Sequence, residues 1–448
     1  MITPLFQVRQ DDEFVYIDIK APHIRAPNIE MVVDKDLFIF SLHPYYLRLR
    51  FPHKVLDDER ANASYDLGKS TVAVKLPKEN KGEEFEDLDM TSKLLARSTN
   101  VSEIGTSSAP LIEEMNQSEP EESMERRKEI FEQAEEFNWE LPQDIPADPK
   151  LFFQANYGFD DKYNGIIGVS LSNGNDINEV YDIEKLKAEE RKLQRIANEN
   201  ERFDIEYYLA DLFDNPMIEE ILEWKSPYTV EFLKWQKSLQ VSSETPSSAN
   251  VYPVKFSTEE QTKMTELPKK TYILTNPKYT YLNVISILFA YAYDNRTTNG
   301  DSSVESPWTI GKITPLFSCL DASQYTLAEI VKVCSRRALC FPLYRHWELI
   351  QKCWDDVYYI LRQGKRGILR VLLKLRQIFG FHDVYYVYNK IWLDDYAIWI
   401  QYANDTVIRS LAHELRKFKV EKDDMEMDLV DYEELARESM QDQEQPEE

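Results

Sequence analysis

The stretch TYLNVISILFAYAY, residues 280–293, is apolar almost all the way round a helical wheel. A helix with no water-favouring face packs inside a protein, so this stretch predicts the central buried helix of a helical domain. Directly after it, the stretch DNRTTNGDSSVESPW at 294–308 turns polar and carries both charges. The change predicts a loop at the C-terminal end of the buried helix.

Amphipathic patterns surround this stretch and predict further helices. The region from 150 to about 418 is mostly helical in pattern, and apolar residues recur in it at intervals of three and four, which marks one inward face per helix. Three such sets are Ile183, Leu186, Leu193 and Ile196; Leu327, Ile330, Val331, Cys334 and Ala338; and Trp347, Ile350, Trp354, Val357, Tyr358 and Leu361. The first set lies on an otherwise charged segment. We expect a large helical domain over residues 137–420.

The N-terminal 97 residues have a different pattern, of short β-branched and aromatic runs separated by prolines and glycine. The runs lie at 14–20, 29–33, 37–40, 46–51 and 71–76. In the fourth run Leu47 and Leu49 point to one side and Arg48 to the other, as in a strand with one buried face. Short strands at even spacing predict a small antiparallel β-sandwich over residues 1–97. The fold class is therefore multidomain, with an all-β part followed by a mostly α-helical part.

Two acidic segments border the helical domain. Between Glu103 and Glu136 eleven acidic residues face three basic ones, which predicts a disordered linker over 98–136. From Glu421 to Glu448 thirteen acidic residues face two basic ones, which predicts a disordered tail over 421–448. The polar stretch QVSSETPSSAN at 240–250 predicts a loop inside the helical domain.

The whole chain is strongly acidic, with 79 Asp and Glu residues against 53 Lys and Arg residues and a formal net charge of −26. Such a field repels phosphate backbones and disfavours direct nucleic-acid binding, while it favours a basic partner such as a nucleic-acid-binding protein. Charge that serves only solubility is the alternative. The four cysteines form no Cys-x-x-Cys pair, and no signal segment or membrane-length apolar run is apparent, so we expect a soluble intracellular protein.

Motifs of catalysis are missing from the sequence. It contains no Gly-rich phosphate loop, no Gly-x-Ser-x-Gly elbow, no His-Glu-x-x-His pair, and no two histidines at metal-ligand spacing on one helix. Cys334 lies near Arg336 and Arg337, which could lower the pKa of its thiol, but its place on an apolar stripe favours a buried structural thiol. We therefore expect no enzyme, no cofactor and no metal site.

One constellation is a candidate partner-binding site, because it combines the loop after the buried helix with basic and aromatic positions that could clamp it. Its members are Asp294, Arg296, Asp301, Glu305, Arg336, Arg337, Arg345, His346 and Trp347. The alternative is an internal ion-pair network, in which Asp294 and Glu305 pair with Arg336 or Arg345 and fix the loop to a neighbouring helix.

The chain resembles the SHQ family of assembly chaperones for box H/ACA ribonucleoproteins, over nearly all of its length except the acidic linker and tail. Its first 97 residues resemble the CS domain, an α-crystallin-like β-sandwich. The stretches that carry the resemblance are FAYAYDNRTTNGDSSVESPW (289–308), SRRALCFPLYRHW (335–347), YGFDDKYNG (157–165), FDIEYYLADLFDNPMIEEIL (203–222), YNKIWLDDYAIWIQ (388–401), YYLRLRFPHKVLDDERANASYD (45–66) and LPKENKGEEFEDLDM (76–90).

The resemblance implies a function. Proteins of this family bind the dyskerin-type pseudouridine synthase before it meets its guide RNA, cover its RNA-binding surface as an RNA mimic, and support assembly of box H/ACA small nucleolar ribonucleoproteins. It implies a monomer in the cytoplasm and nucleoplasm without cofactor, membrane or direct nucleic-acid contact, and a disassembly ATPase is a further candidate partner. The alternatives are a CS-domain co-chaperone of a general heat-shock chaperone, an enzyme, and a plain RNA-binding protein.

Overall fold

The computed structural model describes residues 2–22, 30–42, 44–66, 70–96, 156–241, 252–274, 276–323, 325–341 and 343–444. The expected linker at 98–136 and the expected loop beyond residue 241 lie outside the described residues.

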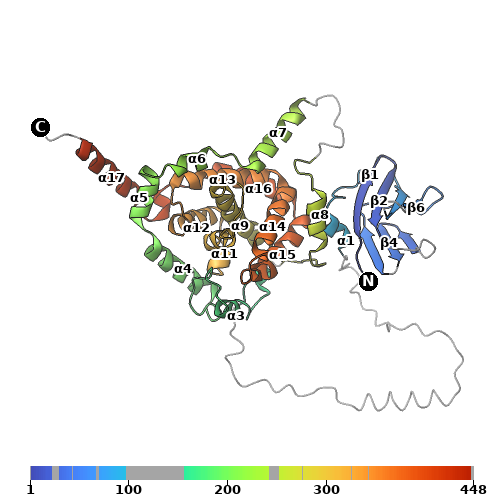
Figure 1. Ribbon diagram of the computed structural model, residues 1–448, viewed down its shortest axis with the longest axis horizontal. Coiled ribbons are helices and arrows are strands. Elements are labelled where there is room, and N and C mark those ends of the chain that lie inside the picture. The colour runs from blue at the N-terminus through green and yellow to red at the C-terminus, as the bar shows by residue number, and fades with distance from the viewer. Residues whose placement is uncertain are drawn as a thin grey trace, which may run out of the picture. The chain divides into compact units, whose positions relative to one another are not determined.

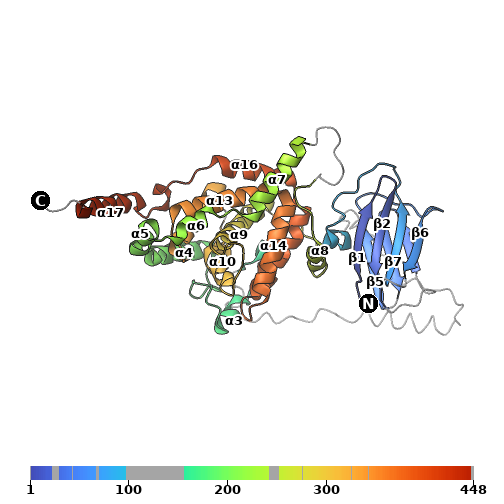
Figure 2. The same cartoon turned by 45° about the horizontal axis from the view of Figure 1, so that its top comes forward.

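The N-terminal part is a two-sheet antiparallel sandwich, as the sequence predicts (Figure 2). One sheet has the strand order β1-β2-β7-β6 and the other has the order β3-β4-β5. The strands are β1 (Leu5–Gln10), β2 (Phe14–Lys20), β3 (Glu30–Asp34), β4 (Leu37–Leu42), β5 (Tyr45–Arg50), β6 (Asn62–Asp66) and β7 (Thr71–Pro77). The first and sixth of these strands were not among the predicted runs.

Alternation of side chains explains the two-sheet core. In β5 the side chains of Leu47 and Leu49 are fully buried, and Leu47 lies opposite Phe40 of β4 in the antiparallel register. In the other sheet Ile17 of β2 lies opposite Val74 of β7, and both side chains are buried. The period of two thus turns one face of each sheet toward a shared apolar interior.

The segment after β7 contacts the helical part of the chain. Asp87, which is almost fully buried, forms ion pairs with Lys93, with Lys365 at 2.7 Å and with Arg366 at 3.2 Å. Burial raises the pKa of the Asp87 carboxyl, but the surrounding ammonium groups outweigh that effect and lower the pKa overall. The helix α1 (Thr91–Leu95) follows, with the Thr91 hydroxyl donating to the backbone carbonyl of Gln261 at 2.8 Å.

The remaining part is mostly helical, again as predicted (Figure 1). Its elements are η4 (Phe159–Asp161), α3 (Ile167–Ser172), α4 (Ala188–Arg202), α5 (Ile205–Phe213), α6 (Met217–Glu223), α7 (Pro227–Val241), α8 (Thr258–Thr265), α9 (Pro277–Thr297), α10 (Ser306–Ile313), α11 (Pro315–Ser318), α12 (Leu327–Cys340), α13 (Trp347–Arg362), α14 (Gly364–Gly380), η6 (Asn389–Leu393), α15 (Asp394–Trp399), η7 (Ile400–Tyr402), α16 (Asp405–Lys417), η8 (Asp423–Met425) and α17 (Leu429–Glu444).

Helix α9 is the central helix of this part, which confirms the prediction for residues 280–293. Every residue from Leu282 to Arg296 is buried, and α10, α12, α13 and α14 pack against it (Figure 1). Pro277 begins the helix at its first position, where a missing N–H costs nothing. The helix runs on to Thr297, so Asp294 and Arg296 lie inside its last turn and not in the following loop. No described helix is long and apolar enough to cross a bilayer.

The predicted inward stripes of α12 and α13 are confirmed. The set Ile183, Leu186, Leu193 and Ile196 is confirmed only before α4, where Ile183 is buried and Leu186 packs against the core; within α4 it is wrong. In α12 and α13 residues such as Ile330, Cys334 and Val357 are buried. In α4 the buried residues are the charged Arg191, Arg195 and Glu199, whereas Leu193 is 67% exposed. These charges are buried because each has a partner: Glu199 pairs with two arginines of α12, and Arg195 pairs with Glu199 and with Asp321 from the segment before α12.

The acidic C-terminal segment differs from the expected disordered tail, because it contains the ordered elements η8 and α17. Its apolar residues Met425, Met427 and Leu429 are buried in the helical core. Composition favoured a solvated chain, but these three side chains anchor the segment to the domain. The residues after Glu444 lie outside the described part.

Candidate partner-binding site

The nine residues of the predicted constellation divide by burial and do not form one surface. Asp294, Arg296, Arg336, Arg337 and His346 are buried; Arg345 and Trp347 are half-buried; Asp301 and Glu305 are exposed. In this conformation the five buried side chains contact the protein interior, and only the remaining four are open to a partner.

Arg296, near the C-terminal end of α9, is committed to internal contacts. Its guanidinium forms a buried ion pair with Asp356 of α13, with distances of 3.0 Å from Nε and 2.7 Å from Nη2. Its Nη1 donates to the backbone carbonyls of Ile221 at 3.0 Å and Trp224 at 2.8 Å. Those carbonyls lie at the C-terminal end of α6, where the last carbonyl groups find no N–H donor within the helix. The arginine supplies the missing donors and so stabilises this end of α6. Burial raises the pKa of the Asp356 carboxyl to about 6, against the opposing effect of Arg296.

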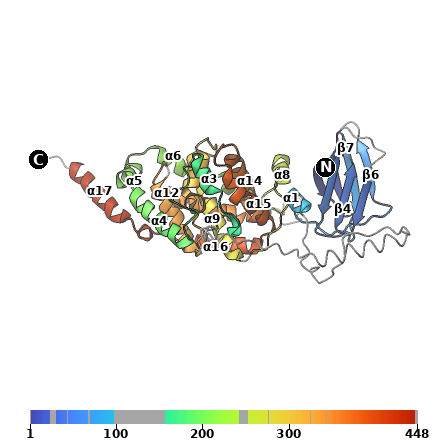
Figure 3. The same ribbon diagram turned by 90° about the horizontal axis from the view of Figure 1, so that it is seen from below.

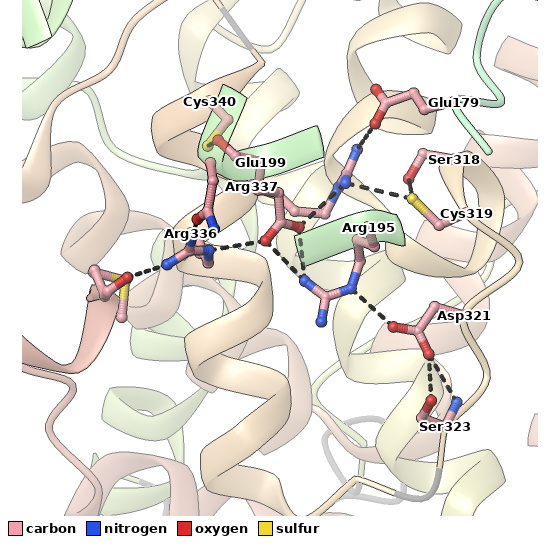
Figure 4. A network of polar contacts seen from close by, with 12 residues as sticks. Glu179, Arg195, Glu199, Ser318, Cys319, Asp321, Ser323, Arg336, Arg337 and Cys340 are labelled. Carbon is pink, nitrogen blue, oxygen red and sulfur yellow. Dashed lines mark hydrogen bonds and ion pairs between the residues drawn. The ribbon is translucent and has the colours of Figure 1, made fainter. Parts of the chain in front are cut away.

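Arg336 and Arg337 of α12 meet on Glu199 of α4, which is completely buried (Figure 4). Glu199 accepts a forked pair of hydrogen bonds from Nη1 of Arg195, at 2.7 and 2.8 Å. It also accepts from Nε of Arg336 at 2.9 Å and from Nη1 of Arg337 at 3.3 Å. One carboxylate thus holds three guanidinium groups from two helices.

Two further carboxylates pair with the arginines of this network (Figure 4). Arg337 pairs through Nη2 with Glu179 at 3.1 Å, and Arg195 pairs through Nε with Asp321 at 2.8 Å. Three guanidinium groups and the ammonium group of Lys312, which pairs with Glu179 at 3.1 Å, therefore face three carboxylates in a largely buried region. Such a network stabilises the fold only when every charge is paired, because each ion has lost its hydration. The structure thus supports the internal ion-pair alternative for these arginines, with carboxylates other than the predicted Asp294 and Glu305.

The cysteines near this network are buried and free, as predicted for Cys334. Burial raises the pKa of the Cys319 thiol and of the Cys340 thiol to about 12 each, and it raises the pKa of Cys334 further. Arg337 lies 3.6 Å from the sulfur of Cys319, but its attraction for a thiolate is smaller than the cost of burial. These thiols are protonated at neutral pH.

The end of α9 contains an isolated buried acid. Asp294 is 1% exposed, and its Oδ2 has no hydrogen-bond partner among the described residues. Burial raises the pKa of its carboxyl to about 6, although a hydrogen bond from Ser306 lowers it in part. Asp294 therefore carries a carboxyl that is costly to ionise, not an ion pair with Arg336 or Arg345.

Arg345 and His346 position the start of α13. The backbone N–H of Arg345 donates to Oδ2 of Asp211 at 2.6 Å, and its guanidinium lies 5.0 Å from the ring centre of Tyr207. Nδ1 of His346 accepts from the backbone N–H of Leu349 and caps the helix, while burial lowers the pKa of its imidazole. Trp347, the first residue of α13, is half-buried.

An exposed part of the constellation lies in the loop before α10. Asp301 and Glu305 are exposed there, and Val304 between them is 84% exposed. A cleft of about 370 Å³ opens beside Val304, with Phe381 at the end of α14 on its wall. Phe381 is 81% exposed, and Lys374 lines the same cleft, so the cleft itself is apolar and basic, while Asp301 and Glu305 flank Val304 in the sequence. Asp301 and Glu305 are therefore the exposed members of the predicted set, and Arg345 and Trp347 are the half-buried ones.

Sequence reasoning missed the carboxylates that hold the arginines: Glu179, Glu199, Asp321 and Asp356. The only local signal was Glu199 four residues after Arg195, a spacing that surface helices use as well. No group of three metal-binding side chains occurs in the part of the chain that the structure describes.

Two family models match the chain. The model described as "SHQ1-like, CS domain" matches residues 3–95, and the model described as "SHQ1 protein, Shq1 domain" matches residues 245–429.

Full-length relatives agree with these matches. "Protein shq1" of Schizosaccharomyces pombe is 39% identical over 98% of this chain and 97% of its own. "Protein SHQ1 homolog" of Xenopus tropicalis is 32% identical over 98% of this chain and 70% of its own, and that of Mus musculus is 32% identical over 97% and 75%.

Proposed function

Because the chain belongs to the SHQ1 family, we propose that it is an assembly chaperone for box H/ACA small nucleolar ribonucleoproteins. It binds the dyskerin-type pseudouridine synthase and shields the RNA-binding surface of that enzyme until guide RNA arrives. Its action consists of binding and release and involves no catalysis of its own.

The observation that carries this proposal is similarity over the whole chain. The 39% identity to the fission yeast protein spans 98% of the residues, so it covers the β-sandwich and the helical part together. A CS domain alone would favour the alternative of a co-chaperone for a general heat-shock chaperone. The match of residues 245–429 to the Shq1 domain favours the assembly chaperone instead.

Charge supports the same partner on independent physical grounds. An RNA-binding surface is cationic, because it must neutralise phosphates. A chain with a net charge of −26 is attracted to such a surface and repels RNA from it. The buried networks around Glu199 and Asp356 leave many other carboxylates on the exterior to supply this field.

The test is competition between the purified full-length chain and guide RNA. The immobilised chain is incubated with the pseudouridine synthase, with and without excess H/ACA guide RNA. Capture that the guide RNA abolishes, and that an unrelated RNA of equal length abolishes less, is the expected result. Capture that no RNA affects would refute the shielding of the RNA-binding surface, and absence of capture would refute the partner.

Salt provides a second measurement on the same complex. Because the attraction is largely electrostatic, the affinity should fall between 50 and 300 mM salt, by roughly tenfold or more. An affinity independent of salt would contradict the electrostatic basis.

We further propose that the chain acts as a monomer in the cytoplasm and nucleoplasm, and that a disassembly ATPase releases it from the synthase. Neither needs a cofactor on this chain. Sedimentation of the free chain and imaging of a fluorescent fusion measure the first two properties, and ATP-dependent release of the captured synthase measures the third.

A further inference from the structure

Helix α17 leaves the helical part of the protein with an apolar stripe that no other described residue covers. We propose that this helix is a docking element, which lays its stripe into a basic, apolar-floored groove on the RNA-binding surface of the pseudouridine synthase. The inference rests on the proposed function and deepens it. It assigns a contact to a helix of which only the first residue, Leu429, lies in the matched Shq1 domain.

The first turn of α17 is held firmly. Leu429 is 1% exposed, and the buried carboxylate of Glu433 accepts a hydrogen bond from the Tyr208 hydroxyl of α5 at 2.5 Å. The same carboxylate pairs with Lys422 at 2.5 Å and with Arg437 at 3.0 Å. Tyr208 and Lys422 thereby hold the base of the helix from outside it, and its direction is set before any partner binds.

The segment leading into α17 is held as well. Lys332 of α12 pairs with Asp424 at 2.6 Å, and Arg336 donates to the backbone carbonyl of Met425. The side chains of Met425 and Met427 are buried. The network around Glu199 therefore also positions the approach to the helix, through Arg336.

Beyond this anchor the helix extends away from α5 in every view (Figure 3). Tyr432, Leu435 and Met440 are 40%, 64% and 42% exposed. With Ala436 they occupy positions i, i+3, i+4 and i+8, which share one side of an α-helix. This spacing is the one by which amphipathic helices enter apolar grooves on other proteins.

Acidic side chains border the stripe. Asp431, Glu434 and Glu438 are exposed and follow each other at intervals of three and four, so they form a second stripe beside Leu435. The only basic residue of the helix is Arg437, which is already paired with Glu433. The binding face is thus apolar in the middle and anionic along one side.

Charge complementarity selects the occupant. A second copy of this chain would bring another acidic helix against the first, and the like charges would repel each other. A cationic RNA-binding groove attracts the acidic stripe and offers apolar surface where bases would stack. Because the helix is already formed and oriented, binding loses less conformational entropy than folding a flexible tail would.

The test compares variants of the full-length chain in a binding titration with the purified synthase. L435S/M440S removes apolar groups from the stripe, and L193S is the matched control, since Leu193 of α4 is 67% exposed and Leu435 is 64% exposed. We expect roughly tenfold weaker binding for L435S/M440S and a change below about twofold for L193S. All three side chains are exposed, so the melting temperatures should agree, which shows that the variants fold.

A charge variant tests the second stripe. D431N/E434Q/E438Q retains the apolar groups and should weaken binding by roughly threefold at low salt, with a smaller effect at high salt.

Each outcome decides a separate point. If the wild-type chain does not bind the synthase, the proposed function fails and the docking inference with it. If the wild type binds and L435S/M440S binds equally well, the function stands and the docking inference is overturned. If the wild type sediments as a dimer that L435S/M440S dissociates, the stripe belongs to a second copy of the chain and the inference is overturned.

Discussion

Replacing Glu199 with glutamine should destabilise the protein strongly, although glutamine has nearly the same shape. Glu199 is fully buried and accepts from Arg195, Arg336 and Arg337. Glutamine could keep one accepting oxygen but would bring an amide N–H₂ group against the guanidinium donors. It would also leave three buried guanidinium groups facing two carboxylates, Glu179 and Asp321.

The expected loss follows from the uncompensated charge. Breaking a buried ion pair by removing one partner costs about 3–5 kcal/mol, because the remaining ion has neither water nor a counter-charge. For a domain of this size each kcal/mol lowers the melting temperature by roughly 2–4 °C, so E199Q should melt about 10 °C below the wild type.

A matched control isolates burial as the cause. Glu259 pairs with Lys263 four residues later at 2.7 Å, the same spacing and distance as Glu199 and Arg195, but Glu259 is 76% exposed. The variant E259Q should change the free energy of unfolding by less than about 0.5 kcal/mol. Both variants are measured by urea denaturation followed by circular dichroism, with thermal melts as a second readout.

A double variant supplies the decisive check. E199Q/R337M removes one negative and one positive charge, so two arginines again face two carboxylates. Its loss of stability should be smaller than the sum of the two single losses by about 1 kcal/mol or more. Equal effects of E199Q and E259Q, or strict additivity in the double variant, would refute the account of a buried network in which Glu199 pairs with the arginines.

Three further predictions concern other parts of the helical domain. The raised pKa of Asp294 means that the folded state takes up a proton more readily than the unfolded chain, so stability falls as pH rises from about 4 to 6. The variant D294N should therefore be more stable than the wild type at pH 7.5, by up to about 3 kcal/mol. Its free energy of unfolding, measured by urea denaturation, should also change less between about pH 4 and 6. An equal pH dependence of the two proteins would contradict the burial of an unpaired acid. An alkylating reagent at pH 8 should label the four buried thiols only after unfolding; they are Cys319, Cys334, Cys340 and Cys353. Rapid labelling of any of them in the native protein would contradict their burial. The variant G311A in α10 should lower stability by about 1–3 kcal/mol, because its methyl group would lie 2.6 Å from the side chain of the buried Ile177. Adding I177A should reduce that loss in thermal melts. A gain in stability, the usual result of replacing glycine in a helix, would contradict this packing.

The parts of the fold that the sequence predicted are those in which periodicity is local. Alternation in β5 identified its buried face, and the uniformly apolar run from residue 280 identified the central helix α9. Each pattern is complete within one strand or one helix, and burial of apolar surface dominates its energy.

The pairing of the arginines in the candidate site could not be predicted from local patterns, because their partners lie far away in the sequence. Arg336 lies 137 residues from Glu199, and Arg296 lies 60 residues from Asp356. In α4 the pattern even pointed the wrong way, since apolar periodicity placed Leu193 inside and the structure places Glu199 there. Periodicity does not reveal a charge that is buried against partners from other helices.

The sequence by itself determined that the chain has a β-rich part, a helical part built about one apolar helix, and a strongly acidic exterior, because these depend on composition and local period. Only the tertiary structure decided which charges are internal and which remain available to a partner. It placed Arg296, Arg336 and Arg337 inside, and it left Asp301 and Glu305 outside. It also ordered the acidic C-terminal segment into the oriented helix α17, although composition predicts a disordered tail there. Burial of Met425, Met427 and Leu429, and of Glu433 with its partners, outweighs the solvation of the other acidic groups.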